Sequence, residues 1–282
     1  MLKWAGGKAR LLARLAAHFP RSCERYVEPF LGGGAVFLAL RDGIPALLND
    51  SNRELLDLYN VVMERPGELV GALDRLGSQY SEEFYYRMRA AIPDDLVERA
   101  ARTVFLNKTG YNGLYRKNSS GGFNVPFGKR KRCPGLYNRA NLAAVGARLR
   151  RAELRCSDFA AVIGEAGPGD FVYCDPPYEP LSKTSSFNAY KDGGFSRKEQ
   201  ERLRDSCAEA ADRGAMVAVS NSSAAFIKEL YAGFDIRTLM ARRVINSKID
   251  RRSEIEEVLV LMGDWTAGKR KPRAAAGRRA PC

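Results

Sequence analysis

The chain has 282 residues, of which 45% are hydrophobic and 28% are charged; it is therefore long enough for one or two domains with a sizeable core, and it is not wholly disordered. No run of about 18 apolar residues occurs and no apolar signal core stands at its start, which excludes a membrane-spanning helix and favours a cytoplasmic protein. The net charge is +13. This surplus points to a polyanionic partner, first of all nucleic acid, although a role in solubility alone is the alternative.

Cysteine and histidine usage argues against metal chemistry. The six cysteines form no C-x-x-C pair, and His18 is the only histidine. A zinc site or a histidine-based triad is therefore not expected. The cysteines are typical of free thiols in a reducing compartment.

The first 61 residues alternate strand-like and helical patterns. A short strand at 26–28 runs into a glycine-rich turn at 32–34, a helix follows at 35–40, and a second strand at 45–48 ends at Asn49-Asp50. This order is typical of the start of a doubly wound α/β sheet.

The glycine turn and the acidic residues near it indicate a nucleotide-like ligand. Asp50 follows Gly32 by 18 residues, close to the ~20-residue spacing at which an acid binds ribose hydroxyls. The full G-x-G-x-x-G signature fails because Phe37 stands at its third glycine position. The turn alone could be a packing feature, but together with Glu28 and Asp50 it points to an adenosine-containing cofactor that need not be a dinucleotide.

The middle of the chain, 62–150, has a different pattern. Residues 80–107 have helical periodicity, and residues 110–132 then carry glycine, asparagine, aromatic and basic residues. Turn residues between two aromatic-bearing arms predict a β-hairpin in this segment.

Strand and helix patterns return in 151–265, and the last residues differ again. A helix is predicted at 196–213. The strand candidates are 153–156, 171–174, 216–219 and 256–261. We therefore expect one discontinuous α/β domain formed by 1–61 and 151–265, a second domain over 62–150, and a basic, disordered tail at 266–282.

The sharpest local motif is Asp175-Pro176-Pro177-Tyr178, which follows the apolar strand at 171–174. The strand brings a carboxylate to the sheet edge where ligands bind, and the prolines fix the turn after it. One carboxylate, the Pro176 carbonyl and the Tyr178 ring suit a planar exocyclic amine, with two hydrogen bonds for its protons and a stack for its ring. A strand that simply ends in a Pro-Pro turn is the alternative.

Four motifs together carry a family resemblance. They are W-A-G-G-K at 4–8, V-E-P-F-L-G-G-G at 27–34, N-D at 49–50 and D-P-P-Y at 175–178. In this order they resemble the Dam-type (D12 class, alpha group) DNA adenine-N6 methyltransferases over residues 2–262. The resemblance implies a Rossmann-like methyltransferase sheet, with an inserted, mostly helical DNA-recognition domain that carries a β-hairpin. It also implies methyl transfer from S-adenosylmethionine to N6 of a flipped adenine in double-stranded DNA, within GATC, by a monomer without metal.

The resemblance also suggests site residues. It implies cofactor contacts for Trp4, Lys8, Asp50, Asp158, Phe159 and Asp175, to which the strand and the glycine turn add Glu28, Phe30, Gly32 and Gly34. The catalytic residues would be Asp175, Pro176 and Tyr178. The expected DNA contacts are Lys3, Tyr111, Asn112, Leu114, Arg116, Lys129 and Arg130.

The expected DNA-contact residues also have purely structural interpretations. A small hairpin core is the alternative for Tyr111 and Leu114, and a solvated loop is the alternative for the basic run 129–132. For the whole chain, the alternatives are a methyltransferase acting on RNA or on protein glutamine, or a DNA-binding protein that has lost transfer. Asp175 and the long basic insert favour DNA as the substrate, and the intact Lys8 and Asp50 favour retained transfer.

Overall fold

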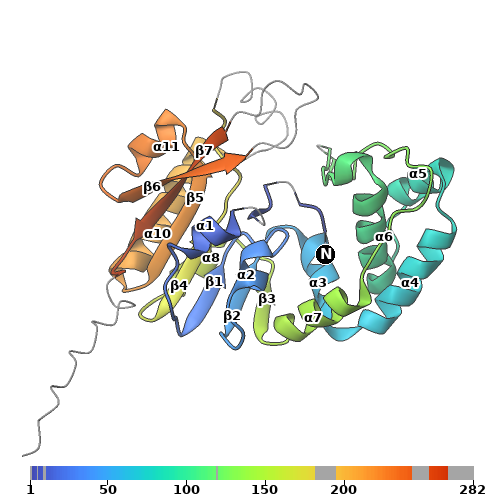
Figure 1. Cartoon of the computed structure of the whole chain (residues 1–282), viewed down its shortest axis with the longest axis horizontal. Helices are drawn as coiled ribbons and strands as arrows, with labels where there is room; N and C mark the ends of the chain where they lie inside the picture. The colour runs from blue at the N-terminus through green and yellow to red at the C-terminus, as the bar shows by residue number, and fades with distance from the viewer. Residues whose placement is uncertain are drawn as a thin grey trace, which may run out of the picture.

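Seven strands form one sheet in the computed structural model, which describes residues 2–4, 6–8, 11–118, 120–181, 195–242 and 254–265 (Figure 1). The strand order is β3-β2-β1-β4-β5-β7-β6. The strands are β1 (Arg25–Glu28), β2 (Ala46–Asn49), β3 (Ala152–Arg155), β4 (Asp170–Cys174), β5 (Met216–Ser222), β6 (Asp235–Arg242) and β7 (Glu254–Met262).

The topology is that of a doubly wound α/β fold. Strands β3, β2, β1, β4 and β5 are parallel, with Val27 of β1 opposite Leu47 on one side and Val172 on the other. The chain runs outward from β1 to β2 and β3, then returns to β4 on the other side of β1. Ligands bind at such a switch point, outside the carboxyl ends of the strands.

The six strands expected from the sequence are confirmed, and β6 is an additional strand. It pairs antiparallel with β7, which is itself antiparallel to β5. As an edge strand it leaves Arg237 and Thr238 exposed. Its apolar pattern is therefore too weak to show in the sequence.

Side chains alternate between the two faces of the sheet, and the central strands are apolar at successive positions. Both faces are therefore apolar, and helices cover both. Phe171 and Tyr173 point into a core shared with α1 (Leu12–Ala16) and α2 (Ala35–Ala39). Val172 and Cys174 point into the opposite core. That second core is closed by α8 (Phe159–Gly164), α10 (Arg197–Asp212) and α11 (Ala225–Leu230).

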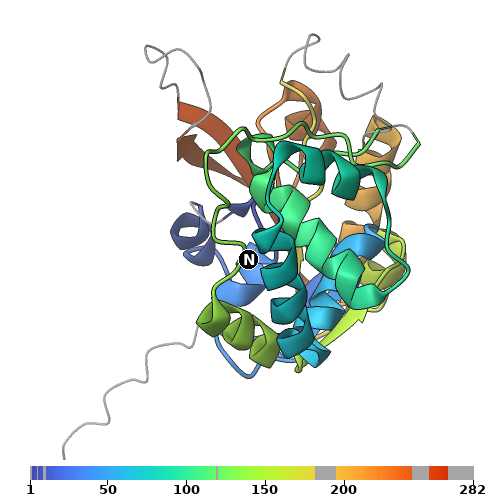
Figure 2. The same cartoon turned by 90° about the vertical axis from the view of Figure 1, so that its right-hand side faces the viewer.

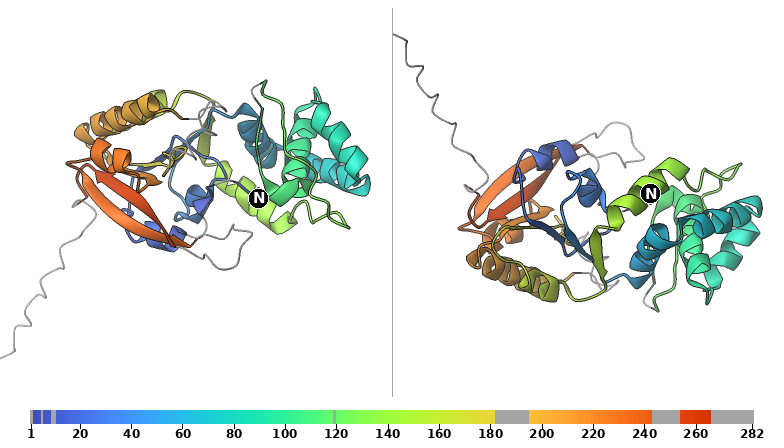
Figure 3. Two further views of the ribbon diagram at one scale, coloured as in Figure 1. Left: turned by 90° about the horizontal axis from the view of Figure 1, so that it is seen from above. Right: turned by 90° about the horizontal axis from the view of Figure 1, so that it is seen from below.

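The remaining helices form a bundle beside the β3 edge of the sheet (Figures 1 and 3). They are α3 (Arg53–Glu64), α4 (Pro66–Ser78), α5 (Glu82–Ala90), α6 (Leu96–Thr109) and α7 (Arg139–Leu149). Helix α6 contacts α3, α4 and α5 and is buried on most of its surface. The continuous helical pattern expected over 80–107 is divided into α5 and α6, with Pro93 in the connection.

The expected β-hairpin is reduced to two isolated antiparallel bridges, Gly110 to Phe127 and Lys117 to Phe123. Between them the chain forms a 3-10 turn, η2 (Tyr111–Gly113). Backbone hydrogen bonds still join the two arms, for example from the Tyr111 amide to the Pro126 carbonyl, while the Val125 carbonyl accepts hydrogen bonds from side chains of α5. The buried Phe123 and Phe127 anchor this segment to the bundle.

No helix within the described ranges is long and apolar enough to cross a membrane. The cytoplasmic location stays a prediction. Residues 266–282, expected to be a disordered tail, lie outside the described residues.

The close approach of α7 to α3 gives a test of the packing. A Cβ on Gly146 would lie 2.7 Å from the Val62 carbonyl oxygen, which is backbone and cannot move aside cheaply. We expect Gly146→Ala to lower the free energy of unfolding by about 1–3 kcal/mol through this overlap. Chemical denaturation measures the change.

Gly71→Ala in α4 is the matched control. Its Cβ would meet only the Arg75 side chain, at 3.7 Å. We expect this variant to gain up to about 1 kcal/mol from helix propensity. A Gly146→Ala variant as stable as Gly71→Ala would contradict the tight helix contact.

Candidate active site

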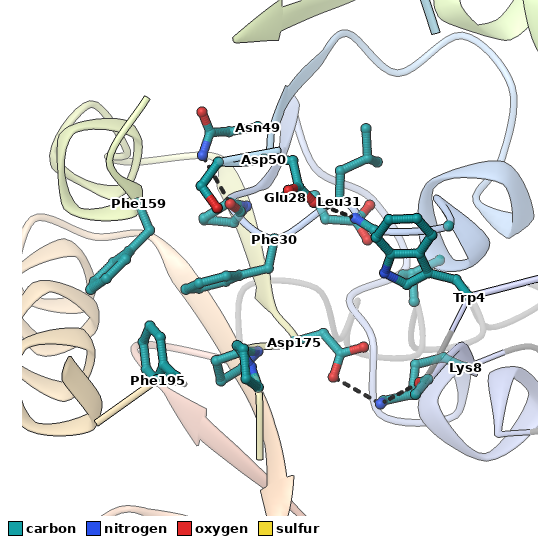
Figure 4. Close-up of a pocket in the computed structure, with 18 of the residues that line it drawn as sticks. Trp4, Lys8, Glu28, Phe30, Leu31, Asn49, Asp50, Phe159, Asp175 and Phe195 are labelled. Atoms are coloured by element: carbon teal, nitrogen blue, oxygen red, sulfur yellow. Dashed lines mark hydrogen bonds and ion pairs between the residues drawn. The ribbon is translucent and has the colours of Figure 1, made fainter. Parts of the chain in front are cut away.

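A cavity of about 710 Å³ opens at the carboxyl ends of β1, β2 and β4. Each strand delivers a carboxyl group to it, with Glu28 at the end of β1, Asp50 just after β2, and Asp175 just after β4 (Figure 4). The cavity therefore lies at the switch point of the sheet, and its size is ordinary for a small-molecule site.

Most of the expected cofactor and catalytic residues lie together in this cavity. Its lining includes Trp4, Lys8, Glu28, Phe30, Gly32, Asp50, Asp158, Phe159, Asp175, Pro176 and Tyr178. Gly34 is not part of the lining; it precedes α2 with φ 65° and so allows the turn into that helix.

Trp4 and Asp50 hold the glycine turn from two sides. Gly32 has φ 48°, and a Cβ there would lie 2.8 Å from Nε1 of Trp4, so only glycine fits beneath the indole. The Gly32 amide donates to Asp50 Oδ2 (2.8 Å), and the Asn52 amide donates to Asp50 Oδ1 (2.9 Å). Burial raises the pKa of Asp50, while these two hydrogen bonds oppose that shift. The carboxylate keeps further lone pairs for a ligand.

Buried Lys8 and the partly buried Asp175 form an ion pair at one end of the cavity. Lys8 Nζ lies 2.8 Å from Asp175 Oδ1 and donates to the Gly6 carbonyl at 3.0 Å. The same ammonium lies 4.5 Å from the centre of the Tyr178 ring. The Tyr178 hydroxyl donates to Glu257 Oε2 of β7 at 2.7 Å. These contacts place a cation, a carboxylate and an aromatic ring around one point.

Burial dominates the ionisation of two of the acids. It raises the pKa of Asp175 to about 6, against the opposing effect of the Lys8 cation. Burial also raises the pKa of Glu28 well above its ordinary value, although the Tyr26 hydroxyl donates to Glu28. Perturbed carboxyl groups of this kind cluster at functional sites.

An aromatic wall closes the other end of the cavity (Figure 4). Phe30, Phe159 and Phe195 contact one another, with ring centres 5.3 to 5.7 Å apart. The Arg202 guanidinium lies 4.1 Å from the centre of the Phe159 ring and binds both carboxylate oxygens of Asp158 at 2.7 Å. Sequence reasoning missed Phe195 and Arg202, because only the fold brings α10 to this wall.

Asn49 ties the strand ends together behind the wall. Its amide donates to the Pro29 and Ser157 carbonyls, and its Oδ1 accepts from the Ser157 amide and hydroxyl. The side chain thereby links the ends of β1, β2 and β3. Its place in the N-D motif was noted in the sequence, but no role followed from it there.

The expected DNA contacts do not line the cavity, and they lie on its bundle side, where Lys3 packs against Gly113. Tyr111 is 53% and Leu114 36% exposed, so they do not form a hairpin core. Arg116 Nε donates to Asn124 Oδ1 at 2.7 Å, and Lys129 and Arg130 are exposed. Asn112 is also exposed, in η2. Burial lowers the pKa of Lys108, and the nearby cations Lys3 and Arg130 lower it further.

Comparison with known proteins gives one consistent result. The family model of the D12 class N6 adenine-specific DNA methyltransferase matches residues 4–245. The type II methyltransferase M.MjaIII of Methanocaldococcus jannaschii is 38% identical, over 92% of this chain and 97% of its own length. The type II methyltransferase M1.LlaDCHI of Lactococcus lactis subsp. cremoris is 37% identical, over 92% and 93%. The DNA adenine methylase of Escherichia coli K12 is 36% identical, over 92% and 94%.

The ion pair allows a direct test of the site electrostatics. Lys8→Met removes the cation beside Asp175, so we expect the pKa of Asp175 to rise above its value of about 6. Carboxyl-carbon NMR of labelled aspartate follows the titration. Lys117→Met, which removes a cation that pairs instead with Glu54 at 3.2 Å, should leave Asp175 unchanged. A pKa that is unchanged or lower in Lys8→Met would contradict the pairing.

Proposed function

We propose, from the premise that the chain belongs to the D12 class of N6 adenine-specific DNA methyltransferases, that it transfers a methyl group from S-adenosylmethionine to an adenine flipped out of duplex DNA. Membership of this family identifies the chain as a DNA adenine methyltransferase. The observation that carries the finer proposal is the placement of Asp175 beside Tyr178, in a cavity with an aromatic wall at its other end.

The residues of the cavity fit S-adenosylmethionine. Phe30 and Phe159 offer flat apolar surface for its adenine, and Asp50 offers carboxylate lone pairs for its ribose hydroxyls. Trp4, Lys8, Glu28, Gly32 and Asp158 complete the set that we assign to cofactor binding, whereas Gly34, outside the lining, shapes the turn. When bound, the cofactor supplies a methyl group on positively charged sulfur.

The chain itself has to activate and orient the adenine amine. Its nitrogen is a weak nucleophile because the lone pair is delocalised into the purine ring. We assign Asp175 Oδ2 and the Pro176 carbonyl as acceptors of the two amine protons, which favours a more tetrahedral and more nucleophilic nitrogen. The Tyr178 ring would stack on the base and hold it in line. Orientation and electrostatics then carry the rate, without a covalent enzyme intermediate.

The helical insert would hold and read the DNA. An adenine in a duplex has to leave the stack before its amine can react, at a cost of a few kcal/mol. We assign residues 62–150 as the target-recognition domain, with Tyr111, Asn112, Leu114 and Arg116 at bases and with Lys3, Lys129 and Arg130 near the backbone. The likeness to Dam-type enzymes makes GATC the first choice of site, and a longer site containing GAT the second.

Labelled methyl transfer tests the proposal. Tritiated S-adenosylmethionine is offered with GATC duplex, RNA or protein, and the product base is identified. We expect N6-methyladenine in the duplex only, and a kcat/KM that falls about tenfold per pH unit below about 6, as Asp175 of the free enzyme gains a proton. Label in RNA or protein instead would overturn the substrate assignment.

Asp175→Ala should abolish transfer while largely sparing duplex binding. Asp170→Asn is its matched control, because it also breaks an ion pair, with Arg25 at 2.7 Å, but at the opposite end of β4. This control should keep most of the activity. Asp175→Ala retaining a tenth of the wild-type rate would contradict the mechanism.

A further pair of variants separates base reading from backbone contact. If Arg116 reads a guanine edge, Arg116→Ala should lower discrimination at that one base by about 1–3 kcal/mol, or roughly 5- to 150-fold. Neutralising both Lys129 and Arg130 should instead weaken binding to all duplexes alike and flatten its salt dependence. Transfer rates on GATC duplexes and on duplexes changed at single positions measure both effects. The opposite pattern would show that the two roles are exchanged.

A further inference from the structure

The N-terminal segment connects the cavity with the bundle. At one end, Lys8 pairs with Asp175 and Trp4 covers the glycine turn. At the other end, Lys3 reaches α6 and the recognition turn, which we define as residues 111–116. Figure 2 shows the start of the chain in front of the sheet and beside the insert helices. A displacement of this segment would therefore change contacts both in the cavity and at the recognition turn.

Asn107 of α6 is the residue that joins these two parts. It is fully buried, and both the oxygen and the nitrogen of its side-chain amide form hydrogen bonds. Its Oδ1 accepts from the Lys3 amide at 2.9 Å. Its Nδ2 donates to the Lys3 carbonyl at 2.8 Å and to the Gly113 carbonyl at 3.0 Å. One side chain thus fixes the N-terminal backbone and the recognition turn to the same point.

Two neighbouring contacts strengthen this connection. Gly113 has φ 66°, and a Cβ on it would overlap Cδ of Lys3, so the Lys3 side chain packs directly on the turn. The Trp4 ring stacks on Tyr115 with centres 4.9 Å apart, and the Tyr115 hydroxyl donates to Glu54 at 2.6 Å. The turn therefore contacts the same segment that supplies Lys8 and Trp4 to the cavity.

We infer that Asn107 is a positioning residue that couples the seating of the recognition turn on DNA to the arrangement of Lys8 and Asp175. A turn that seats correctly leaves Lys3 and the residues after it in place. A turn that is displaced by a wrong base shifts Lys3 through Asn107, and with it the ion pair in the cavity. The inference rests on the proposed function, because it assigns recognition to the turn and transfer to the cavity.

Discrimination by the transfer step tests the coupling. Asn107→Leu removes all three hydrogen bonds at similar volume. Single-turnover transfer is measured on a GATC duplex and on a duplex with one outer base pair changed. We expect the ratio of the two rates to fall about 5- to 150-fold, the usual range of coupling between sites. Equal slowing on both duplexes, with the ratio kept, would overturn the inference in favour of a merely structural role.

Two further variants control for folding. Thr103→Val lies one turn earlier on α6 and removes a buried hydroxyl whose hydrogen bond, to the Arg99 carbonyl, stays within the helix. It should keep the wild-type ratio. Asn107→Ala leaves space for water among the Lys3 and Gly113 backbone groups, so it should fold even where the leucine variant does not. It should lose discrimination like Asn107→Leu.

Hydrogen–deuterium exchange of the protein without DNA separates this inference from the proposed function. We expect peptides containing residues 2–8 and 111–116 to exchange faster together in Asn107→Ala, and neither to change in Thr103→Val. Wild-type protein that methylates no DNA would defeat the proposed function, and the exchange result would still decide the connection. Unchanged exchange of residues 2–8 in the Asn107 variant would overturn it.

Discussion

The ion pair between Lys8 and Asp175 is the interaction on which the site depends. A buried charge pair gains little unless its geometry is good and its other polar atoms are satisfied, whereas removing one partner leaves a costly buried charge. Here the Gly6 carbonyl and the Tyr178 ring surround the ammonium, and Tyr178 is in turn held by Glu257. The ion pair therefore forms only when β4, β7 and the N-terminal segment are all correctly positioned relative to one another.

Different parts of the fold hold the two partners of this ion pair. The strands fix Asp175, because β4 lies between β1 and β5 in the middle of the sheet. Lys8 has no such support from a strand, and the N-terminal segment is instead held through Trp4 on the glycine turn and Lys3 on Asn107. The insert is thus part of the framework of the cavity as well as the proposed surface for DNA.

Structure could be predicted from the sequence where a residue type is restricted to one kind of backbone position or environment. Fully buried parallel strands have apolar runs, a carboxylate before two prolines marks a strand end, and glycines mark the turn under Trp4, so these features could be predicted. The contributions of Phe195, Glu257 and Asn107 depend on partners more than a hundred residues away or on another element, which no local pattern records. The predicted hairpin is present in irregular form, as two isolated bridges, and no local pattern shows that α5 side chains bind the Val125 carbonyl between them.

The acids of the cavity also constrain what can bind there. Burial raises the pKa of Glu28, Asp50 and Asp175, so ionising each of these carboxyl groups costs free energy unless a cation lies nearby. Lys8 compensates Asp175, while Arg202 is engaged with Asp158 at the aromatic wall. A ligand that carries positive charge close to these carboxyl groups would favour their ionised forms. The proposed sulfonium cofactor has that charge, and the ionised Asp175 that it would favour is the form that can accept a hydrogen bond from the adenine amine.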